Sequence, residues 1–212
     1  MENMEYFKRG AVISISHAMV CEPILTVIQK SEENNLSFKV PIEFLRSNVF
    51  KGDTVNCQVF GDEYEFVLKG MISDIDLQYP NYAHICVDKI DRYKNKRENR
   101  RYMVNLLANI SLPNSDQKIY AIVKNIGLKG AGVVFKEKVE LNINDKIYIT
   151  AQVSEKDYLT FTANIIRIEP RGLYSEYGLR INDVDDINKD LLDKLIYQLE
   201  KDEAIYVKDS LK

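Results

Sequence analysis

The sequence contains no tryptophan, and it has only two histidines, three cysteines and five prolines among 212 residues. Cys21, Cys57 and Cys86 show no CxxC spacing, so we expect free thiols rather than disulfides or a zinc site. His84 and Cys86 would share one face of a strand, but no other residue completes a tetrahedral metal site. The sequence therefore predicts no bound metal.

Long hydrophobic runs are also missing. No apolar stretch approaches the roughly 20 residues that a membrane-spanning helix needs. Residues 1–9 lack the apolar core of a secretory signal. We therefore expect a cytoplasmic protein that does not insert into a membrane.

Charge of one sign is not in large excess, because the formal net charge is −3. A general nucleic-acid binder gains its affinity from many phosphate contacts, so this class of protein is disfavoured. The positive charges are nevertheless concentrated in one short segment, which contains Arg92, Lys94, Lys96, Arg97, Arg100 and Arg101. Such a cluster suits a small anionic ligand, although composition alone favours a solvated linker.

Catalytic motifs are absent as well, since there is neither a G-x-S-x-G nucleophile elbow nor an HExxH zinc motif. Asp183, Asp185 and Asp186 could serve acid–base chemistry, but capping the helix that follows them is the simpler role. The sequence therefore predicts no catalytic residues and a protein that is not an enzyme.

The first 92 residues are predicted to form a mainly β domain. Short runs rich in Val, Ile, Phe and Tyr are separated by turn residues such as Lys51-Gly52-Asp53. The predicted strands are 10–16, 24–29, 36–40, 54–60, 64–75 and 82–90. Six short strands at this spacing favour a small barrel or a sandwich.

A polar segment at 91–101 interrupts this pattern, and we place a boundary there between two domains, 1–92 and 93–212. Further strands are predicted at 104–111, 118–124, 131–135, 146–153, 160–168 and 177–181, with turns at 142–145 and 169–172.

The last predicted element is a helix that Asp185 or Asp186 would cap. Its apolar side chains recur every four residues, at Ile187, Leu191, Leu195 and Leu199. This apolar stripe would close the end of a barrel, or it would join two chains in a weak homodimer. We therefore expect a monomer or a weak homodimer.

Two short signatures lie in the second half. The first, Arg97-Glu98-Asn99-Arg100-Arg101, places two arginines four residues apart. The second, Asn125-Ile126-Gly127-Leu128-Lys129-Gly130-Ala131-Gly132, is a glycine-rich turn between β-branched runs. Guanidinium groups bind phosphates and guanine edges, and glycines let backbone approach a ligand closely. The turn is neither a P-loop nor a Rossmann fingerprint. The GXXG loop of KH modules is a weaker fit, because KH domains place it between helices.

Asn125 follows Arg101 by 24 positions. With this spacing the two signatures resemble the R-x-x-x-R and D/N-x-S-x-x-G motifs of PilZ domains, and Tyr177–Ile181 resembles that family's last strand. Pro41 and Val49–Asp53 are similar to the N-terminal domain of flagellar-brake (YcgR-type) proteins. The resemblance implies a mainly β chain with two small β-barrel domains. These would be an N-terminal flagellar-brake-like barrel (1–92) and a six-stranded PilZ barrel (93–212) with its linker at 93–101 and a C-terminal α-helix.

The resemblance also implies cyclic di-GMP as the ligand. Arg97 and Arg101 match the family arginines that contact guanine edges and phosphates. Asn125 matches a position that hydrogen-bonds a guanine edge, and Gly130 matches the glycine that turns the loop. Lys96 matches a basic position that is associated with a stacked pair of ligand molecules.

Gly127 departs from the family pattern, which has serine at this position. Loss of one neutral hydrogen bond costs about 0.5–1.5 kcal/mol, which is at most about tenfold in affinity. We therefore expect weakened rather than abolished binding, and we expect Gly127→Ser to bind the ligand equally well or more tightly.

The function implied is that of a cyclic di-GMP effector. The ligand would order a mobile linker and reorient the N-terminal domain, which would act on flagellar motor or switch proteins or in a related surface-attachment response. Two alternatives stay open. One is a PilZ-like scaffold that has lost the ligand, and the other is a small barrel that binds single-stranded nucleic acid.

Overall fold

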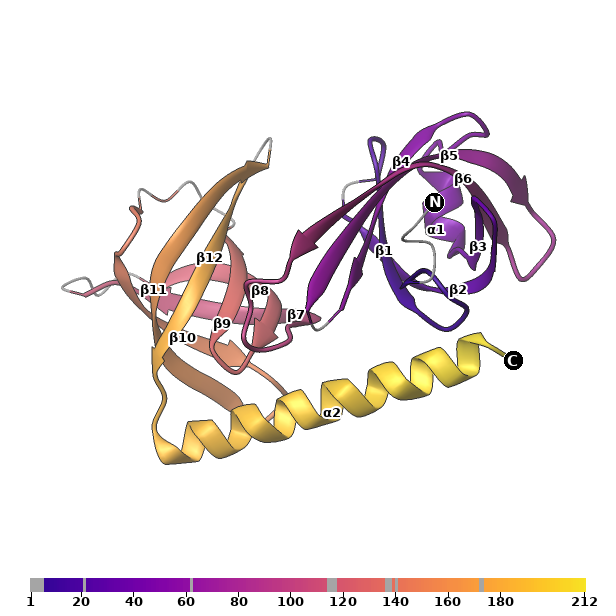
Figure 1. Cartoon of the computed structure of the whole chain (residues 1–212). Coiled ribbons are helices and arrows are strands. Elements are labelled where there is room, and N and C mark those ends of the chain that lie inside the picture. Colours follow the sequence, from indigo (N-terminus) through magenta and orange to yellow (C-terminus); the bar gives the residue numbers. More distant parts are fainter. Residues whose placement is uncertain are drawn as a thin grey trace. The chain divides into compact units, whose positions relative to one another are not determined.

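The chain of this computed structural model folds into two compact units (Figure 1). The first comprises Met1–Lys96 and Glu203–Lys212, and the second comprises Arg97–Asp202. The structure describes residues 6–20, 22–61, 63–113, 118–135, 139, 141–171 and 174–212. Cys21 and Gly172 lie outside the described residues. The predicted boundary between residues 92 and 93 stays a prediction, because compactness alone does not show which segments fold independently.

The first unit is a closed six-stranded barrel in the order β1-β2-β3-β6-β5-β4, so of the two predicted forms the barrel is found. A short helix, α1 (Ile42–Arg46), follows Pro41 and buries Phe44, and it was not predicted from the sequence. The strands are β1 (Val12–His17), β2 (Ile24–Glu32), β3 (Asn35–Lys39), β4 (Thr54–Phe60), β5 (Tyr64–Asp76) and β6 (Tyr82–Lys94).

Burial alternates along β4, as expected for a barrel strand with one face toward the core. In β4 the side chains of Val55, Cys57 and Val59 are buried, whereas the residues between them are exposed or half-buried. Burial raises the pKa of the Cys57 thiol to about 12, so this thiol stays protonated and unreactive. Cys57 and Cys86 are both free thiols.

The second unit is also a closed six-stranded barrel, in the order β10-β11-β12-β9-β8-β7. Its strands are β7 (Tyr102–Ser111), β8 (Lys118–Gly127), β9 (Gly130–Phe135), β10 (Lys146–Gln152), β11 (Tyr158–Arg171) and β12 (Tyr174–Asp183). The predicted fold class, mainly β with two barrels and a C-terminal helix, is therefore confirmed.

Parts of two segments that were predicted as a turn and as a linker are β-strand. The turn expected at 169–172 is wrong in its first part, because β11 continues to Arg171 and pairs Glu169 with Glu176 of β12. The polar segment expected from residue 91 begins later, because β6 continues to Lys94, which pairs with Tyr64 of β5. Both errors have one cause: cross-strand pairing overrides polar composition where a neighbouring strand is long enough to continue the ladder.

The helix α2 (Asp186–Ser210) begins directly after Asp185. The Asp185 carboxylate accepts hydrogen bonds from the backbone N–H and the side-chain amide of Asn188, both at 2.8 Å, and these bonds lower its pKa. Leu192 is buried in the core of the second barrel, as predicted for a closing helix, but Ile187 is 83% exposed and does not join the stripe. The other apolar residues of α2 that pack against this core are Leu191, Leu195, Ile196 and Leu199.

The final residues of α2 belong to the first unit. There the Lys39 ammonium donates to the Ser210 carbonyl oxygen at 2.8 Å, and the Tyr206 hydroxyl donates to the Leu25 carbonyl oxygen at 3.3 Å. The helix therefore contributes residues to both units, which a single barrel-closing helix would not.

Candidate functional site

The predicted glycine turn joins β8 to β9 in the second unit. Gly127 ends β8, Gly130 begins β9, and the two residues are paired across the turn. Asn125 lies two positions earlier on β8, opposite Gly132 of β9. Because β7 follows Arg101 directly and pairs with β8, the arginine segment enters the barrel beside this turn.

Gly127 lies against the backbone of the arginine segment. A Cβ atom at position 127 would collide with the carbonyl oxygen of Arg100 and would lie 3.2 Å from the Cγ atom of Arg101. A backbone carbonyl cannot swing aside as a flexible side chain can, so a serine at 127 would push the segment away. The glycine therefore does more than omit a hydroxyl, since it lets the segment pack on the turn.

The guanidinium group of Arg101 occupies the space above Gly130. A Cβ atom on Gly130 would collide with Nη2 of Arg101 and would lie 2.8 Å from the carbonyl oxygen of Leu179. Arg101 donates from Nη1 to Oδ1 of Asn125 at 3.3 Å and from Nη2 to the Leu179 carbonyl oxygen at 3.5 Å. Both distances are long for N–H···O hydrogen bonds, so these donors retain capacity for a better acceptor.

The surroundings of Arg101 disfavour its positive charge. Burial lowers the pKa of its guanidinium group, and the charges of Arg97 and Arg167 lower it further, while Glu176 acts in the opposite direction. Arginine still carries its proton at neutral pH. A cation that has lost water and is repelled by two others is stabilised by an anion placed among them. The electrostatics of the site therefore favour an anionic ligand.

The side chain of Asn125 fills the space that Gly132 leaves open. A Cβ atom on Gly132 would collide with Nδ2 of Asn125 and would lie 3.0 Å from its Oδ1 atom. The Asn125 amide therefore lies over β9, where Oδ1 accepts the hydrogen bond from Arg101. The amide and the guanidinium group orient each other.

An ion pair also fastens the arginine segment to the turn. Lys129 donates from Nζ to Oε2 of Glu98 at 2.6 Å, and this hydrogen bond and charge lower the pKa of Glu98. Both side chains are largely exposed, so the pair contributes little stability. Together with the packing of Arg100 on Gly127, it places the arginine segment against the turn. The mobility expected of this segment stays a prediction.

The two remaining predicted site residues flank the point where the units divide. Arg97 is the first residue of the second unit, and its charge acts on Arg101. Lys96 belongs to the first unit, and its predicted role in binding stays a prediction.

Arg167 and Gly178 lie near the site and were given no role from the sequence, and Gly132, the last glycine of the second signature, was given no separate role. Arg167 of β11 pairs with Gly178 of β12, and Gly178 pairs with Gly132. The register between β11 and β12 shifts between Ile165 and Arg167, so sequence spacing alone does not reveal these pairs. Strict alternation would place Arg167 on the same inner face as the buried Ile165, which lies two positions earlier. The register shift between these two residues instead places Arg167 on the outer face.

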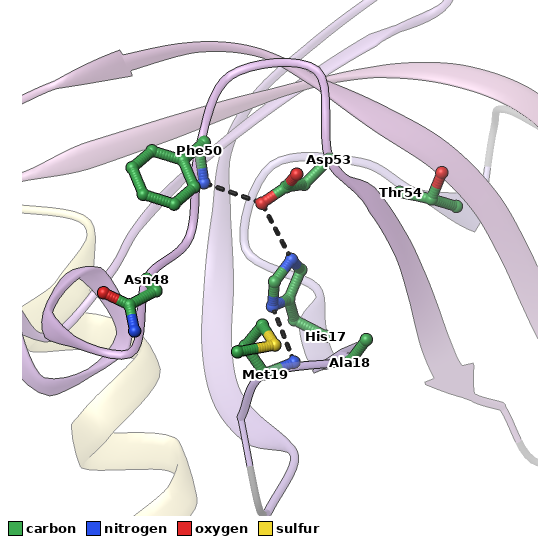
Figure 2. A pocket seen from close by; sticks show the side chains of 7 residues that line it. All are labelled: His17, Ala18, Met19, Asn48, Phe50, Asp53 and Thr54. Atoms are coloured by element: carbon green, nitrogen blue, oxygen red, sulfur yellow. Dashed lines mark hydrogen bonds and ion pairs between the residues drawn. The ribbon is translucent and has the colours of Figure 1, made fainter.

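The first unit holds a separate cavity of about 370 Å³ (Figure 2). His17 lies in it with both ring nitrogens engaged: Nδ1 accepts from the Met19 N–H, and Nε2 donates to Oδ2 of Asp53, each at 3.1 Å. The same Asp53 oxygen accepts from the Phe50 N–H at 2.8 Å. The imidazole is thus satisfied within the fold, which indicates a structural role. The lining residues are His17, Ala18, Met19, Asn48, Phe50, Asp53 and Thr54.

Within the described part of the chain, no three His, Cys, Asp or Glu side chains converge as metal ligands would. Among the helices described, none is long and apolar enough to cross a membrane.

Residues 95–198 match the family model of the PilZ domain, and this part of the chain is therefore a PilZ domain. It contains both sequence signatures and the barrel that carries them. No relative among curated proteins matches the chain.

Solved structures with the same two-barrel fold include MrkH of K. pneumonia in complex with c-di-GMP. It is 10% identical with a TM-score of 0.56, and the match covers 93% of this chain and 90% of that chain. A second structure of MrkH, described as a c-di-GMP-dependent transcription regulatory factor, is 10% identical with a TM-score of 0.51 and coverages of 92% and 86%. YcgR of Escherichia coli in complex with c-di-GMP is 11% identical with a TM-score of 0.49 and coverages of 96% and 89%. At these identities the likeness to the two MrkH structures concerns the fold alone.

The packing of Arg100 on Gly127 predicts that Gly127→Ser detaches the arginine segment. We expect trypsin to cleave after Arg97, Arg100 and Arg101 several-fold faster in this variant, because cleavage follows local opening. Limited proteolysis followed by mass spectrometry measures the rates. Leu128→Ser is the matched control, since it places the same hydroxyl one residue further along, where a side chain already exists. Equal cleavage rates in Gly127→Ser and the unchanged chain would contradict the packing.

Proposed function

We propose that this protein is a receptor for cyclic di-GMP, which carries two phosphates and two guanines. The observation that carries this proposal is the placement of Arg101, which is partly buried, repelled by two arginines and held among the described residues by two long hydrogen bonds. A guanidinium group offers a planar fork of donors that matches phosphate oxygens and the acceptor edge of guanine. The ligand would add an anion to the stabilisation that the charge of Glu176 gives this cation.

Each site residue then has a role in binding. Arg101 exchanges its long bonds to neutral oxygens for shorter bonds to an anionic ligand, and Arg97 adds a second positive charge. The Asn125 amide hydrogen-bonds a guanine edge. Gly130 and Gly132 leave room on the outer face of β9 for the Arg101 guanidinium group and the Asn125 amide, which would lie between this strand and the ligand. Gly127 acts indirectly by letting the arginine segment pack on the turn, so Gly127→Ser is now expected to weaken binding rather than preserve it.

Arg101→Ala tests the receptor function directly. We expect at least a tenfold loss of affinity for cyclic di-GMP, because charge-assisted hydrogen bonds are worth about 1.5–3 kcal/mol. Isothermal titration calorimetry on the full chain measures it, and Arg46→Ala in the first unit is the control for loss of one arginine. Absence of binding heat with the unchanged chain at micromolar concentrations would refute the receptor function.

We also propose that binding changes the arrangement of the two units. The arginine segment follows Lys96, the last residue of the first unit before the division, so contacts to Arg97 and Arg101 act on the connection itself. Such a change is a two-state switch that the ligand biases by binding one state better.

The stoichiometry from the calorimetric titration with cyclic di-GMP tests whether Lys96 supports a stacked pair of ligand molecules.

Small-angle X-ray scattering of the full chain with and without cyclic di-GMP tests the rearrangement. We expect the radius of gyration to change on saturation, because the arginine segment that would contact the ligand is one of the two places where the chain passes between the units. Arg101→Ala, which should not bind, serves as the control and should give one curve under both conditions. Superimposable curves for the unchanged chain at saturation would rule out the rearrangement.

The proposed output is regulation of flagellar motility or of a related surface-attachment response in the cytoplasm, without catalysis, by a monomer or weak homodimer. Flagellar motor or switch proteins are the proposed partners. The support is the similarity of Pro41 and Val49–Asp53 to the corresponding positions of flagellar-brake proteins.

A transcriptional output is the second candidate, because the two-barrel fold is shared with MrkH. It requires nucleic-acid binding, which the net charge of −3 disfavours. Salt-dependent binding to oligonucleotides in the presence of cyclic di-GMP would support it.

The other alternative is a scaffold that has lost the ligand. Such a protein would bind its partner equally well after substitution of both Arg97 and Arg101.

A further inference from the structure

A row of paired residues crosses the outer face of the second barrel beside Arg101. Arg167 of β11 pairs with Gly178 of β12, Gly178 pairs with Gly132 of β9, and Gly132 pairs with Asn125 of β8. The row faces outward, because the neighbours of both glycines along their strands are core residues, namely Tyr177, Leu179, Ala131 and Val133. The row spans three strand spacings, which is roughly 14 Å.

The two glycines make the middle of this row a shallow platform, and a polar side chain leans over it from each end. The Asn125 amide covers Gly132. At the other end, a Cβ atom on Gly178 would lie 3.1 Å from the Cβ atom of Arg167 and 3.3 Å from its Nε atom. Arg167 and Asn125 therefore lie over two glycines that are paired with each other on adjacent strands.

The charge of Arg167 is held by two carboxylates. Its Nη1 atom lies 2.8 Å from Oε1 of Glu169, and its Nη2 atom lies 3.7 Å from Oε1 of Glu176. The Arg167 side chain is 47% exposed, so the ion pair is solvent-screened and weak. Its positive charge nevertheless acts on Arg101, whose pKa it lowers. A phosphate near Arg101 would therefore attract Arg167 as well.

We propose that Arg167 is a third arginine of the ligand site, which contacts a phosphate of the bound nucleotide from the far side of the glycine platform. This inference rests on the proposed cyclic di-GMP site. Glu169 competes with the ligand for the same guanidinium group, so binding replaces the Arg167–Glu169 ion pair with an Arg167–phosphate contact. The exchange makes Glu169 a residue that limits affinity.

Calorimetric titration of cyclic di-GMP into four full-length variants tests the proposal. Arg167→Gln should weaken binding about tenfold, as expected for loss of one charge-assisted contact, whereas Arg46→Gln should not change it. Glu169→Gln should tighten binding several-fold, because it removes the competing carboxylate. In the double variant Arg167→Gln/Glu169→Gln this tightening should disappear, since residues that act through one contact are not additive.

Unchanged affinity in Arg167→Gln would overturn the inference and leave the proposed function intact. The inference would also be wrong if Glu169→Gln tightened binding equally in the Arg167→Gln background, because Glu169 would then act on the ligand without Arg167. If Arg167→Gln fails to fold, the Glu169→Gln variant still decides, since unchanged affinity there contradicts the competition. No binding by the unchanged chain would remove the proposed function and this inference together.

Discussion

The candidate site depends on one steric fact: the guanidinium group of Arg101 occupies the volume that a side chain at Gly130 would fill. This position desolvates the cation and sets it beside the Asn125 amide and the Leu179 carbonyl oxygen, with hydrogen bonds of 3.3 and 3.5 Å. Burial and the charges of Arg97 and Arg167 disfavour the positive charge of Arg101, and the charge of Glu176 acts in the opposite direction. An anionic ligand bound at Arg101 would add to the stabilisation that Glu176 provides.

At each of the other glycines of the site, another group occupies the space that a side chain would need. This group is the Arg100 carbonyl at Gly127, the Asn125 amide at Gly132 and the Arg167 side chain at Gly178. These groups come from the segment before β7 and from β8 and β11, which are far apart in sequence. The glycines therefore determine which polar groups converge on the outer face of the barrel.

The sequence predicted the fold class well, because short β-branched strands and turn residues are local signals. It also identified the turn at Gly127–Gly130, whose motif is local as well. It did not identify Arg167, because the pairing of Arg167 with Gly178 depends on a register shift between β11 and β12. It treated Gly127 as the loss of a hydroxyl, because the Arg100 backbone that packs there is 27 positions earlier in the chain and only the folded structure brings the two together.

The most direct measurement is the affinity of Gly130→Ala for cyclic di-GMP, determined by calorimetry alongside an unfolding curve. The added methyl group takes the place of the Arg101 guanidinium but removes no donor, acceptor or charge from the chain. We expect binding to be lost or weakened at least tenfold while the variant stays folded. A folded Gly130→Ala variant that binds as tightly as the unchanged chain would contradict the central role of Arg101.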